Sequence, residues 1–327
     1  MNTIINFIFA AIKAGAPLLF GTTGEIITEK SGSLNLGVEG IMYMGAFAGF
    51  LAGFLTNNIL LALLAAMLAG ALCGLLFAFF TVTLQANQNV TGLTLTIFGA
   101  GCAEFFGEML IRSTENGNPK LSNEFYSKLS EIHIPYLSDI PVIGKILFSH
   151  NILVYLGIAV AVICGIYLHN TRAGLRMRAI GENPAAADAY GINVTAVKYF
   201  NIMLGGAICG LGGAYISLIN GNGVWNNGCI SGQGWIAVAL VIFARWNPFT
   251  AILGSLIFGG FTVFQVRAHD FSAAFPVLSF LDKIPNAIYV MLPFLITAIV
   301  LIISTIKKDR VSNEPAACGL NYYREER

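Results

Sequence analysis

Three stretches rich in glycine and amide side chains interrupt an otherwise apolar sequence. They cover residues 31–40, 85–92 and 220–228, and Gln233 and Trp235 follow the third closely. Glycine allows a helix to break or another backbone to approach, while amides both donate and accept hydrogen bonds. Lipid cannot satisfy such groups, so at membrane depth they must face protein or water. Any one stretch could be an interfacial turn, but three of them favour the lining of a polar path.

The side chains assigned to this path could hold an uncharged solute through hydrogen bonds and ring stacking. They are Asn35, Glu39, Asn87, Asn89, Gln233 and Trp235. A lone carboxylate such as Glu39 must be paired or hydrogen-bonded at that depth. Lys30 is the nearest basic residue in the sequence and therefore the candidate partner.

Two further carboxylates, Glu104 and Glu108, lie four residues apart on one face of a predicted span. Acids inside a membrane often mark proton or ion paths. Arg112 follows Glu108 by four residues, however, and this spacing suits an ion pair on a helix. Contact with Arg112 or water is the favoured interpretation, because no further buried acid or base continues a relay.

Side chains for enzyme chemistry are not arranged in any recognisable set. The four histidines are isolated near loops, and the six cysteines form no CxxC pair. No Ser/His/Asp or Cys/His combination has a plausible spacing. We therefore expect no catalytic residues, no metal site and no cofactor.

The composition excludes a water-soluble globule. Of the 327 residues, 56% are hydrophobic and only 11% are charged, and the mean hydropathy is +0.73. Soluble domains carry about 25% charged residues. The net charge of +1 provides no basic field for a phosphate backbone, so nucleic acid is not an expected partner.

Apolar runs bounded by polar, proline or glycine residues predict an all-α polytopic membrane protein with about nine transmembrane helices. The predicted spans cover residues 3–22, 37–55, 59–84, 92–111, 151–169, 199–220, 232–244, 248–267 and 284–305. Residues 1–308 form the predicted transmembrane domain. Residues 309–327 form a polar cytoplasmic tail that we expect to fray.

Basic residues set the predicted orientation. Arg172, Arg176, Arg178 and Lys198 place the 171–198 segment in the cytoplasm. An odd number of spans away, the 112–150 loop lies outside, and its balanced charges allow it to translocate.

The order of the elements predicts an inverted internal repeat. A polar break, a glycine-rich span, a tight turn and a second glycine-rich span occur once after Gly32 and again after Gly228. The first copy starts inside and the second outside. Such repeats place a site near the membrane midplane, where helices are broken.

The segment from Arg178 to Val194 predicts a short helix that needs a docking surface. Asn183 can cap it, Pro184 suits its first position, and Gly191 can end it. About two turns are too short to be stable alone. Its alanine-rich face lacks the large apolar side chains that would anchor a helix in lipid.

Four sequence blocks resemble the permease subunits of bacterial ABC importers of the nucleoside and simple-sugar class. The blocks are EKSGSLNLGVEG at 29–40, ANQNVTG at 86–92, RAIGENPAAADAYGINV at 178–194 and GGAICGLGGAY at 205–215. This class lies within a larger group that also holds ribose and branched-chain amino acid permeases. The first block most resembles the nucleoside branch.

The resemblance implies a set of partners and a coupling site. The coupling residues, which would seat on the ATPase subunit, are Gly181, Asn183, Pro184, Ala186, Ala187, Gly191 and Ile192. The implied partners are an ATP-binding subunit, a homologous but non-identical second permease chain and an extracellular substrate-binding lipoprotein. The implied location is the inner or plasma membrane of a bacterium, in contact with lipid.

The predicted function is the pore-forming subunit of an ATP-driven importer. The chain has no G-x-x-x-x-G-K-[ST] loop, so a separate subunit must bind ATP. Nucleosides are the favoured cargo, because uncharged ribose and base edges suit amide and aromatic groups. The alternatives are an ABC permease for simple sugars or branched-chain amino acids, a secondary transporter driven by protons through Glu104 and Glu108, and a membrane scaffold or channel.

Overall fold

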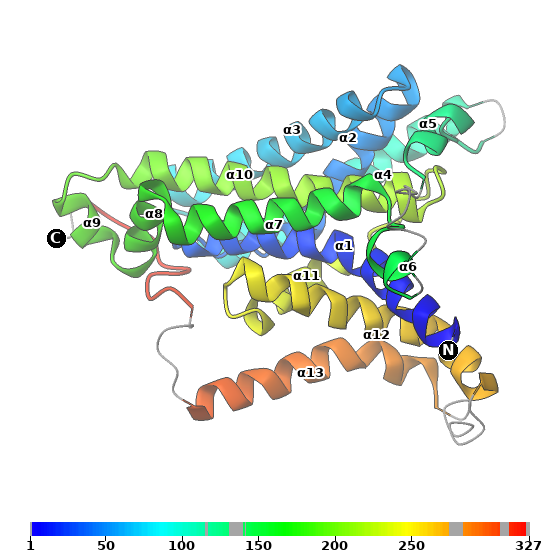
Figure 1. Ribbon diagram of the computed structural model, residues 1–327. Coiled ribbons are helices and arrows are strands. Elements are labelled where there is room, and N and C mark those ends of the chain that lie inside the picture. Colours follow the sequence, from blue (N-terminus) through cyan, green and yellow to red (C-terminus); the bar gives the residue numbers. More distant parts are fainter. Residues whose placement is uncertain are drawn as a thin grey trace.

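The computed structural model describes residues 2–114, 117–130, 140, 142–274, 284–307 and 314–324, and in this part of the chain the regular structure is helical (Figure 1). The helices in chain order are α1 Asn2–Lys30, α2 Val38–Thr56, α3 Ile59–Ala78, η1 Phe79–Thr83, α4 Gln88–Ser113, α5 Asn123–Lys128, α6 Ile143–Leu147, α7 Ile152–Asn170, α8 Arg172–Glu182, α9 Pro184–Ala189, α10 Val194–Tyr215, η2 Ile216–Asn220, α11 Gln233–Phe243, α12 Pro248–Ala274 and α13 Asn286–Lys307.

A helix lies at each of the nine predicted spans, so the all-α membrane architecture is confirmed. Within the described residues, seven helices are long and apolar enough to cross a membrane. The run predicted at 232–244 is not among them. It forms α11, which has 11 residues and at 1.5 Å per residue covers about half of a bilayer core. A partial helix of this kind must leave its ends inside the protein.

Helix α1 continues to Lys30, whereas the sequence predicts its end at residue 22. Its last turns carry Glu25 and Glu29, which lie beyond the predicted end of the span. Their carboxyl groups are not left in lipid. Glu25 accepts a hydrogen bond from the backbone N–H of Asn35 at 3.1 Å, and Glu29 accepts one from the indole of Trp246.

The long helices define two ends of the molecule, which we name by their short helices. Helices α8 and α9 lie at one end, together with the C-terminus, and α5 and α6 lie at the other, near the N-terminus (Figure 1). Helix α10 runs from the α9 end to the α5 end and is the most buried of the seven candidate spans.

Glycines bring α10 close to its neighbours. A Cβ atom added to Gly70 on α3 would lie 2.1 Å from the carbonyl oxygen of Gly206 on α10, and one added to Gly45 on α2 would lie 2.4 Å from Gly210. Such contacts are possible only without a side chain. Close backbone approach of this kind supplies much of the packing energy between membrane helices.

The C-terminal segment departs from the sequence prediction. We expected the tail to fray, but residues 314–324 pack along the α9 end (Figure 1). The N–H of Ala317 donates to the carbonyl of Gly181 at 2.8 Å. Residues 115–116, 131–139 and 141 of the predicted 112–150 loop lie outside the described part, and so do residues 309–313 and 325–327 of the predicted tail.

We expect a methyl group at position 70 to destabilise the fold. Gly70→Ala forces α3 and α10 apart, whereas Gly101→Ala is a matched control, because a Cβ there has nothing within 4 Å. Thermal unfolding of the purified protein should show a clear loss of stability for Gly70→Ala and none for Gly101→Ala. Equal melting temperatures for the two variants would contradict the proposed close packing.

Candidate polar translocation site

The first and third glycine-rich stretches meet at the start of two helices. Helix α11 begins after Gly232, which has a left-handed backbone with a φ of +83°. Glycine has no side chain, so it cannot cap the helix. The carboxylate of Glu39, in the first turn of α2, accepts hydrogen bonds from the N–H groups of Gly232 at 2.8 Å and Gly234 at 2.6 Å. One helix thus supplies the cap that the other lacks.

The two helices run away from this meeting point in opposite directions. Helix α11 follows α1, because Ala237 accepts from Thr22 at 3.0 Å and Trp246 donates to Glu29 near the α9 end. Helix α2 ends at the α5 end, where Asn57 accepts from Ser122 just before α5. An inverted repeat requires opposed helices of this kind.

The sequence pointed to Lys30 as the partner of Glu39, but the carboxylate is held by backbone N–H groups of α11. The approach is close because residue 234 is glycine. A Cβ atom there would lie 2.4 Å from the Cα atom of Glu39. On its other side α2 contacts α4, where a Cβ on Gly40 would lie 2.4 Å from the Leu95 carbonyl. The start of α2 is therefore clamped between α4 and α11.

A line of polar side chains extends from Glu39 toward the α5 end. The hydroxyl of Tyr43 donates to Glu104 at 3.2 Å and accepts from the N–H of Gly228. Asn227 donates to Glu108 at 3.3 Å. We call Glu39, Tyr43, Glu104, Glu108 and Asn227 the polar seam. It joins α2 and α4 to the segment before α11.

The predicted pairing of Glu108 with Arg112 is confirmed, with 3.0 Å between Arg112 Nε and Glu108 Oε1. Both side chains are largely exposed, Arg112 by 78% and Glu108 by 46%, so the ion pair contributes little to stability. Glu104 is engaged by Tyr43. Both acids therefore have partners within the protein.

Five of the six predicted path residues fall into two groups. Glu39, Gln233 and Trp235 lie together where α2 and α11 begin, and the indole of Trp235 is 36% exposed. Asn87 and Asn89 are exposed at the start of α4, where the Asn87 side chain caps the helix by accepting from Val90 at 3.1 Å.

Asn35 has a different environment from the other path residues. It is only 2% exposed, and its side-chain oxygen accepts from the N–H of Gly37 at 2.8 Å. Its side chain therefore braces the turn before α2. Nearby, Gln88 is buried and accepts from the N–H of Leu34 at 2.8 Å, which connects the first stretch to the second.

Sequence reasoning missed several residues of this region. Glu25 and Glu29 were counted as loop residues, although their spacing of four, directly before a break, is a helical signal. Tyr43 and Asn227 were not assigned to the path, because a tyrosine in a span and an asparagine in a turn have ordinary structural roles. Within the described residues, no group of three or more His, Cys, Asp or Glu side chains could hold a metal ion.

The predicted short helix is confirmed as α9. Asn183 caps it by accepting from the N–H of Ala186 at 3.0 Å, Pro184 is its first residue, and Gly191 follows it with a φ of +77°. Ala187 is buried against Ile180 and Val194.

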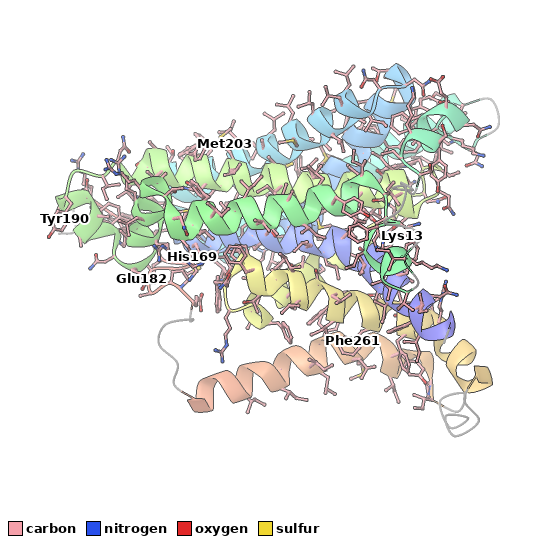
Figure 2. All side chains as sticks on the ribbon, in the orientation of Figure 1. Lys13, His169, Glu182, Tyr190, Met203 and Phe261 are labelled. Carbon is pink, nitrogen blue, oxygen red and sulfur yellow. The ribbon has the colours of Figure 1, made fainter. Side chains whose placement is uncertain are left out.

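The other side of α9 faces away from the protein. Ala186 is exposed, and Tyr190 is 89% exposed at the extreme tip of the molecule (Figure 2). The remaining predicted coupling residues divide similarly. Gly181 is buried, Ile192 is half-buried, and Asn183 and Gly191 are exposed.

Broken helices that meet inside a multi-pass α-helical bundle, together with a short capped helix presented at one end, define a membrane transport permease. The chain belongs to the family described as the permease component of the branched-chain amino acid transport system, whose model matches residues 7–303. It is accordingly an ABC transporter permease subunit, a transport component and not an enzyme.

Three relatives illustrate the range of named cargoes. The chain is 34% identical to the nucleoside ABC transporter permease protein NupC of Lactococcus lactis, over 98% of both chains. It is 36% identical to the guanosine ABC transporter permease protein NupQ of Bacillus subtilis, over 89% of both. It is 31% identical, over 99% of both, to TsgC13 of Haloferax volcanii, which is provisionally named a glucose ABC transporter permease protein.

Replacement of Glu39 tests the cap on α11. Glu39→Ala leaves two N–H groups without their acceptor, and each such hydrogen bond to a charged group contributes about 1.5–3 kcal/mol. We expect a lower melting temperature of the purified protein, with a smaller effect for Glu39→Gln, which keeps one acceptor oxygen. Glu124→Ala on exposed α5 is the control and should leave the melting temperature unchanged. Wild-type stability of Glu39→Ala would show that the cap is dispensable.

Proposed function

We propose that this chain is a pore-forming subunit of an ATP-driven importer of nucleosides. It would work with a separate ATPase subunit, a second permease chain and a substrate-binding lipoprotein, in the inner or plasma membrane of a bacterium. The proposed path passes the meeting point of α2 and α11, with Glu39, Gln233 and Trp235 in its wall.

The observation that carries the cargo class is the position of the Glu39 carboxylate. Helix N-termini attract anions, because their free N–H groups and the helix dipole present positive charge. At this site the protein's own carboxylate already occupies the N-terminus of α11. A phosphate or carboxylate on a solute would meet a filled anion site, so an uncharged cargo suits the path better.

This reasoning ranks the alternatives. A branched-chain amino acid carries a carboxylate and fits the path less well than a nucleoside or a sugar does. Between those two, the exposed indole of Trp235 offers a face for base stacking, and stacking on an aromatic side chain contributes about 1–3 kcal/mol per base. The relatives named for nucleoside and guanosine transport support the same choice.

A proton-driven mechanism has less support than ATP-driven import. Glu104 and Glu108 are held by Tyr43, Asn227 and Arg112, and the family is one of ABC permeases. Uptake that stops with vanadate or ATP depletion but continues with an uncoupler would distinguish the two energy sources.

Cargo is tested by uptake in cells with and without this chain. We expect deletion to abolish the accumulation of radiolabelled guanosine or uridine, and excess unlabelled nucleoside to compete in wild-type cells. Excess glucose or leucine should not compete. Loss of glucose uptake with unchanged nucleoside uptake would overturn the proposed cargo and favour the sugar alternative.

Helix α9 is the proposed docking element for the ATPase subunit. The cytoplasmic placement of this end is supported by Arg172 and Arg176, which lie on neighbouring α8. An exposed tyrosine beside a short exposed helix is the type of anchor that dominates protein interfaces. Ala186 and Tyr190 are therefore the proposed contact residues, whereas Ala187 supports α9 from inside.

We expect Ala186→Arg and Tyr190→Ala to abolish co-purification of the ATPase subunit and substrate-stimulated ATP hydrolysis, because both alter the docking surface and leave the buried side of α9 intact. Ser127→Arg, exposed on α5, is the control and should retain the ATPase subunit. Ala187→Arg is unsuitable, since it would disrupt the chain's own packing. Normal ATPase binding by both α9 variants would refute docking at this helix.

A further inference from the structure

Residues 314–324, here called the C-terminal strap, connect α9 to the first two polar breaks. At its start, Pro315 packs on Gly181, where a Cβ atom would come within 3.2 Å of the proline Cβ. The N–H of Ala317 donates to the carbonyl of the same glycine at 2.8 Å. The strap is thereby fixed to the end of α8, two residues before Asn183, the cap of α9.

The middle of the strap satisfies polar groups that the second break leaves free. After η1 ends, the carbonyls of Gln85 and Ala86 accept hydrogen bonds from the side chain of Asn321, at 3.1 Å for Ala86. Gln88 donates to the Leu320 carbonyl at 3.2 Å and to the Asn321 side chain at 3.1 Å. The strap therefore holds the second break in place through hydrogen bonds to its backbone carbonyls and to Gln88.

Gln88 extends this connection to the first break. Its side chain is buried, and its oxygen accepts from the N–H of Leu34 at 2.8 Å while its nitrogen donates to the strap. One amide therefore joins the strap, the 85–92 stretch and the 31–40 stretch. Its hydrogen bonds cannot all persist if one of the three segments moves alone.

The end of the strap is attached to α9 itself. The hydroxyl of Tyr322 donates to Asp188 at 2.8 Å, and the Arg324 guanidinium lies 3.3 Å from the same carboxylate. The ring of Tyr322 also packs against the small apolar cluster of Ile180, Ala187 and Val194.

A cavity lies between α9 and the second polar break at 85–92. The strap connects α9 to this break. The cavity has a volume of about 360 Å³ and is lined by Gln85 near η1, by Asp188, Asn193 and Lys198 on the α9 side, and by Tyr322 of the strap. The strap bridges the two walls along one side, so it is one route by which a displacement of α9 can reach the breaks. The first break also lies directly against the end of α8, where a Cβ on Gly32 would be 3.3 Å from the Cα atom of Gly181.

We propose that the C-terminal strap transmits movement of α9 to the polar breaks at 31–40 and 85–92, with Tyr322 and Asn321 as positioning residues. The inference rests on the proposed docking of the ATPase subunit at α9. It assigns the tail a role in coupling ATP hydrolysis to transport, since both breaks precede helices that border the proposed path.

The test uses the assembled transporter with Tyr322→Phe, which removes one hydroxyl and keeps the ring, and Asn321→Ala. Tyr323→Phe is the matched control, because Tyr323 is exposed beside it. We expect both strap variants to bind the ATPase subunit and hydrolyse ATP, while nucleoside uptake per ATP falls about tenfold. This is the scale of the one hydrogen bond to a carboxylate that Tyr322→Phe loses, or of the bonds to two neutral carbonyls that Asn321→Ala loses. The control should keep the wild-type ratio.

A double-mutant cycle identifies the contact responsible. If the Tyr322–Asp188 bond carries the effect, Asp188→Ala combined with Tyr322→Phe should be no worse than Asp188→Ala alone, which also removes the contact with Arg324. Unchanged uptake per ATP in Tyr322→Phe and Asn321→Ala overturns the proposal, and so does loss of ATPase binding in these variants, which would make the strap part of the docking surface. Failure of docking at α9 is detected separately by Ala186→Arg, which leaves the strap untouched.

Discussion

The interaction between Glu39 and the N-terminus of α11 determines the arrangement of the centre of this protein. A helix of 11 residues cannot cross a bilayer, so its first N–H groups lie inside, where water is scarce and lipid accepts no hydrogen bonds. The carboxylate of Glu39 supplies the missing acceptor. In return, the N–H groups and the helix dipole stabilise a charge that would be costly at that depth. Neither feature would persist without the other.

Glycine makes the hydrogen bonds between Glu39 and the start of α11 geometrically possible. The carboxylate can reach α11 only because Gly234 allows the backbones to touch, and α2 is held in register by Gly40 against α4 and by Gly45 against α10. Each contact tolerates no Cβ atom. The glycines in these helices therefore have two roles, since they break helices at the polar stretches and pack them closely elsewhere.

The sequence predicted the helices well, because long apolar runs and capping residues are local signals. The caps of α9 at Asn183 and Gly191 and the ion pair of Glu108 with Arg112 depend on neighbours within a few residues. The partner of Glu39 could not be found this way, because it is a backbone group almost two hundred positions away. The polar end of α1 was missed for the same reason, since Glu29 is tolerated there only through Trp246 of the turn after α11. The tail was expected to fray because its own composition is polar, whereas its order comes from distant partners: carbonyl groups of the second break, Gly181 of α8 and Asp188 of α9.

The polar stretches share one physical property: groups in each of them are hydrogen-bonded by residues from a distant part of the chain. Glu39 completes the third, Gln88 connects the second to the first, and Asn321 of the tail completes the second. Where these hydrogen bonds are buried, as at Gln88, lipid offers no replacement partner, so separating the segments costs several hydrogen bonds at once. A displacement of one member of such a network strains the hydrogen bonds of the others. This is the property that an importer needs if work done by a cytoplasmic partner is to reach the membrane interior.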